Sequence, residues 1–332
     1  MDPTNVIVVS GEFGDDIQGT GRLMNTSEKG TASKAVKTIA RAVELSTTGS
    51  VIFVYPGVYS GPRNHDLKVN LVDLTISTLK GPYWTSVNCG RQARFLAGTS
   101  STIVMEGLTL QNCLEVNGGV FNIVDGSFSG TNMLITDSSA SQNGGVFYAS
   151  GSNIILDQVS IVNCSASDEG GAVYLEGSVA SMDKSNVTKS TATRGGAMAL
   201  RGSSSLSTTD TKFFGNSASE RGGGTYVNGV VILQGVYLVS NEASSGGGLA
   251  MDNGNLTMEN CVVSNNTAEI GGGLTLNSMS TIHVGTISTI IQNNKAGTAG
   301  GGMYVTGTTN VTFDKQVASP SMISNNIACK YT

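Results

Sequence analysis

The chain has 332 residues, of which 44 are glycine and only 13% are charged, and its formal net charge is −5 at pH 7. This acidic balance and the absence of a basic patch argue against a nucleic-acid partner. Apolar residues are frequent and regularly placed, which argues against disorder. The sequence holds no nucleotide-binding loop, no zinc-ligand spacing and no transmembrane run, so we expect neither a cofactor nor a membrane span.

The N-terminal segment differs from the rest of the chain. A helical spacing of apolar residues predicts a helix over Thr31–Leu45, with Thr31 or Ser33 as its N-cap. We expect this helix to cover the open N-terminal end of a stack of strands, because core and strand edges would otherwise be exposed there. The predicted organisation is an N-terminal segment with a capping helix, 1–50, followed by one continuous β-domain, 51–332.

The β-domain begins with a short apolar run that reads as a buried strand. This run is Val51–Tyr55, and Pro56 and Gly57 end it. Leu74–Ile76 and Thr102–Met105 have the same character and are predicted to be the next inward-facing strands.

Further along the chain, the dipeptide Gly-Gly recurs at intervals of about 24 to 29 residues, which is the range of solenoid repeats. Alternating apolar residues follow each pair, as expected for a strand with one buried face. A unit of this length cannot bury its own apolar face, so the units must stack on one another. The glycines would permit a bend that Cβ atoms would obstruct. The pairs are Gly118-Gly119, Gly144-Gly145, Gly170-Gly171, Gly195-Gly196, Gly222-Gly223, Gly246-Gly247, Gly271-Gly272 and Gly300-Gly301.

Parallel strands that recur once per coil, about 4.8 Å apart, place equivalent residues on top of one another. In each of the later repeats, an asparagine stands two positions before the alanine that recurs in every unit: Asn216, Asn241, Asn266, Asn294 and Asn326. Stacked asparagine amides can hydrogen-bond along the axis and satisfy buried turn backbone. We therefore predict an all-β, single-stranded parallel β-helix of roughly twelve coils.

Two stretches resemble known families. Thr38–Ala42 followed by Val54–Tyr59 resembles the opening of pectin-lyase-like proteins, whose fold is a right-handed parallel β-helix. The unit from Ser264 to Gly273 is similar to the repeats of chlamydial polymorphic outer membrane (Pmp-type) proteins and of protist surface proteins. The resemblance implies a right-handed β-helix. Since proteins with such repeats are mainly autotransporter adhesins or surface proteins, it also implies a cell-surface or secreted location.

Many β-helix proteins degrade polysaccharides, but the motifs of that chemistry are missing here. Polygalacturonase-type enzymes need clustered aspartates with Gly-His-Gly and Arg-x-Lys motifs, and this sequence has neither motif. The two histidines, His65 and His283, have no carboxylate or cysteine at a useful spacing and read as loop or surface residues. We therefore expect no catalytic residue.

Three aspartates on consecutive coils, Asp157, Asp183 and Asp210, are the nearest candidate for a metal site. Stacked carboxylates repel one another unless a cation, or Lys184 and Lys212, neutralises them. A solvated face with local ion pairs is the favoured interpretation, and a cation site is the alternative.

Charged residues also stand next to the Gly-Gly pairs. Arg194 and Arg221 each precede a pair, near Glu169, Glu220 and Glu269. This spacing predicts an alternating ladder of ion pairs at one turn, without catalysis.

Tyrosines lie between inward-facing positions and should therefore face outward: Tyr148, Tyr174, Tyr226 and Tyr304. Exposed rings on a flat face could stack on sugar rings or pack against a partner protein. The alternative is stabilising stacking between neighbouring strands.

Five cysteines are present, and Cys113 and Cys164 share a register but lie two coils apart, beyond disulfide reach. We therefore expect buried free thiols, with at least one cysteine unpaired in any case. The others are Cys89, Cys261 and Cys329.

The two ends of the chain raise the questions of location and assembly. The residues before Val6 are polar, so no signal peptide is visible, although the fold class favours an extracellular or surface location. The chain stops within a repeat, so we expect either a fragment of a longer protein or a partner over this end. Ile323 and Ile327 would then present a strand edge and core to another copy, as a closed dimer or a fibre.

The function that these patterns favour is a non-catalytic, adhesin-like surface scaffold that binds a protein or a glycan, or assembles with other copies of itself. The alternative is a carbohydrate-active enzyme, either a lyase or a hydrolase.

Overall fold

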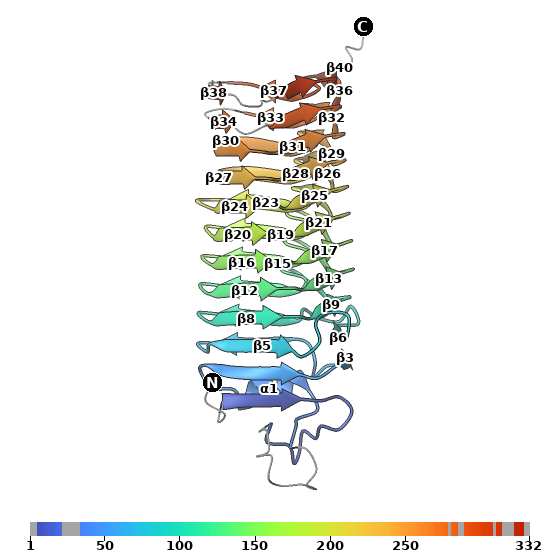
Figure 1. Ribbon diagram of the computed structural model, residues 1–332, viewed down its shortest axis with the longest axis vertical. Coiled ribbons are helices and arrows are strands. Elements are labelled where there is room, and N and C mark those ends of the chain that lie inside the picture. Colours follow the sequence, from blue (N-terminus) through green and yellow to red (C-terminus); the bar gives the residue numbers. More distant parts are fainter. Residues whose placement is uncertain are drawn as a thin grey trace.

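The computed structural model describes residues 5–21, 34–277, 280–284, 289–307, 310–313 and 322–328. The chain winds into a tall stack of coils, with the N-terminus at one end and the C-terminus at the other (Figure 1). In the described residues the strands form three sheets, and every strand pairs in parallel with its equivalent on the next coil. The prediction of an all-β parallel β-helix is therefore confirmed.

The largest sheet forms one long wall of the stack, and most coils contribute two successive strands to it. The two strands merge into one in β27 and again in β30. Within the described residues this sheet consists of β1 Val6–Val9, β2 Ser50–Val54, β4 Leu67–Asn70, β5 Leu74–Thr78, β7 Leu96–Thr99, β8 Thr102–Glu106, β11 Phe121–Val124, β12 Ser127–Thr131, β15 Phe147–Ser150, β16 Asn153–Asp157, β19 Val173–Glu176, β20 Val179–Asp183, β23 Met198–Arg201, β24 Ser205–Thr209, β27 Thr225–Gln234, β30 Leu249–Glu259, β33 Leu274–Leu276, β34 Ser280–Val284, β37 Met303–Val305 and β38 Asn310–Phe313.

The second sheet receives one strand from each of eleven described coils, close to the predicted coil number. Its strands are β3 Gly57–Ser60, β6 Thr85–Asn88, β9 Thr109–Gln111, β13 Leu134–Thr136, β17 Ser160–Val162, β21 Asn186–Thr188, β25 Lys212–Phe214, β28 Tyr237–Val239, β31 Val262–Ser264, β35 Ile290–Gln292 and β39 Met322–Ser324.

The third sheet is narrower and leads into the Gly-Gly turns. In the part of the chain that the structure describes, its strands are β10 Leu114–Glu115, β14 Ser139–Ala140, β18 Ser165–Ala166, β22 Thr191–Arg194, β26 Ser217–Arg221, β29 Glu242–Ser245, β32 Thr267–Ile270, β36 Lys295–Ala299 and β40 Ile327–Ala328.

One continuous apolar core fills the stack from Ile7 to Ile291. Inward-facing residues alternate with outward-facing ones, and side chains of equivalent positions contact one another along the axis. Phe121 and Phe147, on consecutive coils, stack with ring centroids 4.7 Å apart. Each such fully buried large side chain contributes about 1.5–3 kcal/mol by leaving water.

The Gly-Gly turns have the geometry that requires two glycines. The first glycine of each pair has φ between +63° and +67°, a region that L-residues rarely adopt. At the second, a Cβ would collide with backbone: on Gly145 it would lie 2.1 Å from the carbonyl oxygen of Gly171 and 2.5 Å from that of Ser165. These turns therefore bring the third sheet close against the start of the next strand.

The asparagine ladder is continuous from Asn216 to Asn326. On Asn241, for example, the backbone N–H and Nδ2 both donate to Oδ1 of Asn266, over 2.9 Å and 3.1 Å. Nδ2 of Asn241 also donates to the carbonyl oxygen of Phe213 at 3.0 Å. Oδ1 of Asn241 in turn accepts from the backbone N–H of Asn216, so each amide satisfies backbone groups of the preceding coil and bonds to the asparagine of the next one.

The N-terminal helix is shorter than predicted. Helix α1 spans Ile39–Leu45 and lies at the N-terminal end of the stack, where it buries Ile39 and Ala42 (Figure 1). Its N-cap is Thr38, because Val36 is held extended by a bridge to Val9 and Asp16 accepts hydrogen bonds from Lys37 and Thr38. Thr31 and Ser33, the predicted caps, lie outside the described residues.

The parallel sheet also begins earlier than Val51, since β1 pairs with β2 in register Val6↔Val51. At the other end of the stack, Ile323 is 54% exposed and Ile327 is 57% exposed. Assembly through these two residues stays a prediction.

The prediction of free thiols throughout is wrong for two cysteines. Cys89 and Cys113 form a disulfide between adjacent coils, with Cα atoms 4.8 Å apart. Cysteines on adjacent coils are close enough for a disulfide, whereas the prediction compared only Cys113 and Cys164, which lie two coils apart. Cys164 and Cys261 are buried free thiols, and burial raises their pKa values to about 12 and about 11. Cys329 lies outside the described residues.

Candidate functional site

The predicted tyrosines lie in one column on the outside of the largest sheet, just after the Gly-Gly turns. Strand pairing places the members of this tyrosine column on successive coils. In order they are Tyr148, Tyr174, Ala199, Tyr226, Ala250, Thr275 and Tyr304.

These rings face outward as predicted, but the expectation of an exposed aromatic face is wrong. Tyr174 is 9% exposed and Tyr226 is 2% exposed, while Tyr148 and Tyr304 are half-buried. Tyr148 and Tyr174 stack on each other, with centroids 5.4 Å apart and planes 13° apart. The ring faces are therefore occupied within the protein, which agrees with the alternative of stacking between strands.

Ala199 stands between Tyr174 and Tyr226 in this column, and Arg201, two residues further along the same strand, contacts Tyr226. Its guanidinium carbon lies 4.6 Å from the ring centroid of Tyr226, and Nη1 donates to the tyrosine hydroxyl at 3.1 Å. Nε and Nη2 donate to the two carboxylate oxygens of Glu169, the first over 2.7 Å. The planar guanidinium is thus fixed on three sides.

Glu169 is a buried carboxylate held between two arginines. It is 6% exposed, and besides Arg201 it has Nε of Arg194 at 3.0 Å. Arg194 also lies 3.5 Å from the exposed Glu220, so the predicted ladder of ion pairs exists around this residue. The terminal nitrogens of Arg194 make no hydrogen bond within the described protein, so two of its donor groups remain available to a ligand.

A second network lies two coils further along the axis. Asp252 accepts hydrogen bonds from the hydroxyl of Tyr226 at 2.7 Å, from Arg221 and from Nδ2 of Asn277 at 3.1 Å. Asp252 is the extra residue of a bulge in β30, which turns its side chain toward the tyrosine column. The expected partner of Arg221 was a glutamate, and Glu269 forms no ion pair among the described residues.

These contacts change the acid–base properties of the site. Burial raises the pKa of Tyr226 to about 12, and the hydrogen bond to Asp252 acts in the same direction. Burial and the hydrogen bond to Glu176 likewise raise the pKa of Tyr174. The hydrogen bonds to Glu169 raise the pKa of Arg201. None of these three groups is therefore suited to act as a general base near neutral pH.

A depression opens over this first network, on the outside of the stack. It holds amide, carboxylate, guanidinium and phenol groups within one small area of rigid strand and turn. Its lining residues are Asn143, Asp168, Glu169, Tyr174, Glu176, Arg194, Arg201 and Gly202.

Most of these lining residues could have been found by aligning the repeats on their first glycine. The position six residues later is apolar after the first pair, where it is Val124, and polar after the seven pairs that follow: Ser150, Glu176, Arg201, Asn228, Asp252, Asn277 and Thr306. From the sequence we considered the tyrosines and the charged residues that precede Gly-Gly. We did not consider the position six residues after the first glycine, and we therefore missed Glu176, Arg201 and Asp252.

The predicted aspartate ladder lies elsewhere, at the far end of the largest sheet. Asp157 stacks on Asp183, but Asp210 falls one position off their column, since Asp183 pairs with Thr209. Nζ of Lys184 lies 2.6 Å from Asp183, and this hydrogen bond raises the pKa of the lysine. In the described part of the chain, no three His, Cys, Asp or Glu side chains are grouped so that they could hold a metal.

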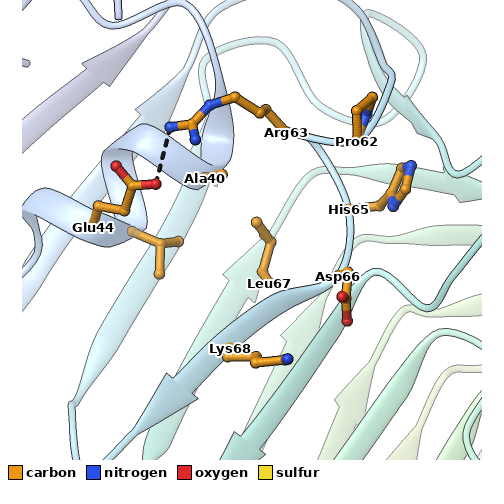
Figure 2. Close-up of a pocket in the computed structure, with 9 residues that line it drawn as sticks. Ala40, Glu44, Pro62, Arg63, His65, Asp66, Leu67 and Lys68 are labelled. Carbon is orange, nitrogen blue, oxygen red and sulfur yellow. Dashed lines mark hydrogen bonds and ion pairs between the residues drawn. The ribbon is translucent and has the colours of Figure 1, made fainter.

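A second depression lies between α1 and β4 (Figure 2). Arg63 reaches across it to Glu44, with 3.0 Å between the paired atoms, and also approaches Asp16. His65 lies on the other side of the chain from Glu44 and Leu67 (Figure 2), and it is buried with no hydrogen-bond partner for either ring nitrogen. Of the expected loop or surface position, His65 has the first, since it lies in the loop before β4, but it is not at the surface. The ion pairs here anchor α1, so we assign this depression a structural role.

Comparisons with known proteins found two solved structures with distant similarity. A rhamnogalacturonan lyase is similar with a TM-score of 0.37 and 12% identity, over 88% of this chain and 70% of that chain. The catalytic domain of a GH87 alpha-1,3-glucanase variant in complex with nigerose is similar with a TM-score of 0.38 and 13% identity, over 97% and 68%. No family model and no curated protein matches the chain.

The two solved structures are carbohydrate-active enzymes by name, and at this TM-score and identity they carry no argument about this chain. The prediction of a non-catalytic protein and the resemblance to Pmp-type repeats both stay predictions. The described helix lacks the length and apolar character needed to cross a bilayer.

Proposed function

We propose that this protein is a non-catalytic, adhesin-like β-helix that binds a glycan in the depression around Glu169. The observation that carries the proposal is the array of hydrogen-bonding groups fixed there. Arg194 has two unused donor groups, Asp168 and Glu176 offer acceptors, and the side-chain nitrogen of Asn143 is not engaged by the protein. Sugar hydroxyls need such mixed donors and acceptors, and rigid strands reduce the entropy lost on binding.

We further propose that the protein works outside the reducing cytosol, as a secreted or surface protein. The disulfide between Cys89 and Cys113 supports this location, because disulfides persist in oxidising compartments. Partner proteins and other copies of the chain are the competing ligands, and a glycan array separates them from sugars.

The alternative function is a carbohydrate-active enzyme. A hydrolase needs two carboxylic acids, one of them able to donate a proton. Glu169 does not suit that role because both of its carboxylate oxygens are already paired with arginines, so Asp168 and Glu176 would have to carry the reaction. A lyase needs a base, and the raised pKa values of Tyr226 and Arg201 disfavour both of them.

A glycan array with the wild-type protein tests the proposal. The Arg194→Gln variant should lose most of the binding, because it removes the two unused donor groups of the guanidinium. Lys212→Gln is the matched control, since Lys212 is an exposed cation on β25, outside the depression. Absence of binding to every glycan would contradict the proposal.

Turnover is measured in parallel on the polymers that bind, by the release of reducing ends and by the ultraviolet absorbance of unsaturated products. We expect neither signal. Turnover that Asp168→Asn or Glu176→Gln abolishes would overturn the non-catalytic assignment and establish the hydrolase alternative.

A further inference from the structure

The charges around the depression do not balance. Five carboxylates and three guanidiniums belong to the two connected networks or line the depression. They are Asp168, Glu169, Glu176, Glu220 and Asp252 against Arg194, Arg201 and Arg221. Every arginine has a carboxylate partner, so the uncompensated charge of this surface is negative.

The two carboxylates without a cationic partner are the ones that line the depression. Glu176 accepts a hydrogen bond from the neutral hydroxyl of Tyr174 at 2.7 Å. Asp168 is exposed, and no arginine or lysine pairs with its side chain in the described part of the chain. A ligand in the depression therefore meets two full negative charges at its edge.

Arg194 is the group that could attract an anion, and its surroundings oppose that role. Glu169 at 3.0 Å and Glu220 at 3.5 Å flank its guanidinium on two sides. Two carboxylates near one cation leave the local field negative, although the terminal nitrogens remain free to donate hydrogen bonds to uncharged hydroxyls.

We infer that the depression selects uncharged glycans and rejects polyanionic ones, whether their charge is a uronate carboxylate or a sulfate ester. The inference rests on the proposed function and narrows its ligand class. Like charges at close range weaken the binding of an anionic ligand, and such repulsion is a common source of specificity. The whole chain, with a net charge of −5, acts in the same direction at longer range.

The test compares hexasaccharides of equal length by calorimetry or affinity electrophoresis at low salt. Xylo- and cello-oligosaccharides are the uncharged probes, an oligogalacturonate carries carboxylates, and a chondroitin sulfate oligosaccharide carries sulfates as well. We expect the uncharged probes to bind about tenfold or more tightly than either anion, with the gap narrowing as salt screens the charges.

Glu176→Gln should reduce this discrimination, because glutamine removes the charge and keeps an acceptor for the hydroxyl of Tyr174. Asp168→Asn should act in the same way. Asp210→Asn is the matched control, since it makes the same change of net charge at an exposed turn after β24. Its discrimination should equal that of the wild type.

The outcomes separate the inference from the function on which it rests. An anionic probe that binds as tightly as the uncharged probes overturns the charge selection and leaves glycan binding standing. An equal effect of Asp210→Asn and Glu176→Gln assigns the preference to the whole chain and contradicts a role of the depression. If no probe of either kind binds, the proposed function fails and the inference fails with it.

Discussion

At the scale of single residues, the candidate site is organised by paired charges over a column of nearly buried tyrosines. Glu169 fixes Arg201, and Arg201 in turn covers the ring of Tyr226. The hydroxyls of Tyr174 and Tyr226 donate to Glu176 and Asp252. Because each partner restrains the next, we expect the effects of substitutions in this network to be non-additive.

Tyr226 predicts a loss of stability at alkaline pH. Its pKa is raised from 10.0 to about 12 by burial, so the folded state keeps the phenol proton after the unfolded state has lost it. The contribution to stability is therefore complete below about pH 10 and disappears as the pH rises to about 12. Denaturant unfolding across this range, together with the absorbance of tyrosinate, measures the effect.

The Tyr226→Phe variant is the control, because phenylalanine keeps the ring and has no proton to lose. Its stability should depend less on pH in this window than that of the wild type. An unchanged dependence would show that Tyr226 titrates normally.

Glu169 is predicted to contribute far more to the stability of the fold than the exposed Glu220. Glu169→Gln should lower the free energy of unfolding by about 2–3 kcal/mol, because two arginines lose a nearly buried counter-charge. Glu220→Gln should change it by no more than about 0.5 kcal/mol, since that side chain is 58% exposed. Urea unfolding of the two variants checks this, and equal losses would contradict the account.

At the scale of elements, the repeat is held together by two devices that differ in kind. The Gly-Gly turns are steric, since a side chain has no room between coils. The asparagine ladder is a chain of hydrogen bonds that requires an amide, because one side chain must both donate and accept. Both follow from the stacking of identical positions along the axis.

Gly145 tests the steric device. Gly145→Ala should cost more than about 3 kcal/mol or prevent folding, because its Cβ would meet backbone oxygen atoms at 2.1 Å and 2.5 Å. Gly177→Ala should cost only about 1–2 kcal/mol. Its φ of +54° strains an alanine, but the surrounding space is open, so the added Cβ meets no atom. Thermal unfolding compares the two, and a similar loss for both would refute the steric explanation.

Asn266 tests the ladder. Asn266→Ala leaves the N–H of Asn241 and the carbonyl oxygen of Leu238 without their partners, which should cost about 2–3 kcal/mol. Hydrogen exchange at Asn241 should accelerate at the same time. Asn253→Ala, at an exposed position on β30, should stay within about 0.5 kcal/mol of the wild type. If hydrogen exchange at Asn241 is unaltered, the ladder does not contribute to stability as proposed.

At the scale of the whole molecule, the fold follows from the sequence because one short pattern repeats many times. An apolar position shared by Val263 and Leu238, and the glycines after it, leave few arrangements other than a stack of coils. The candidate site was harder to predict from the sequence than the fold. The burial of Tyr226 depends on Arg201, a residue outside the motif, and the disulfide of Cys113 depends on its neighbour one coil away.

The function of the whole molecule rests on which face of the stack receives a ligand. Hydrogen exchange, read by mass spectrometry with and without the glycan that binds best, tests this most directly. We predict that protection appears in residues 166–176 and 194–202, which contain Asp168, Glu176 and Arg201, and that Arg194→Gln abolishes it. Protection confined to residues outside these two segments, or none at saturating glycan, would contradict the account.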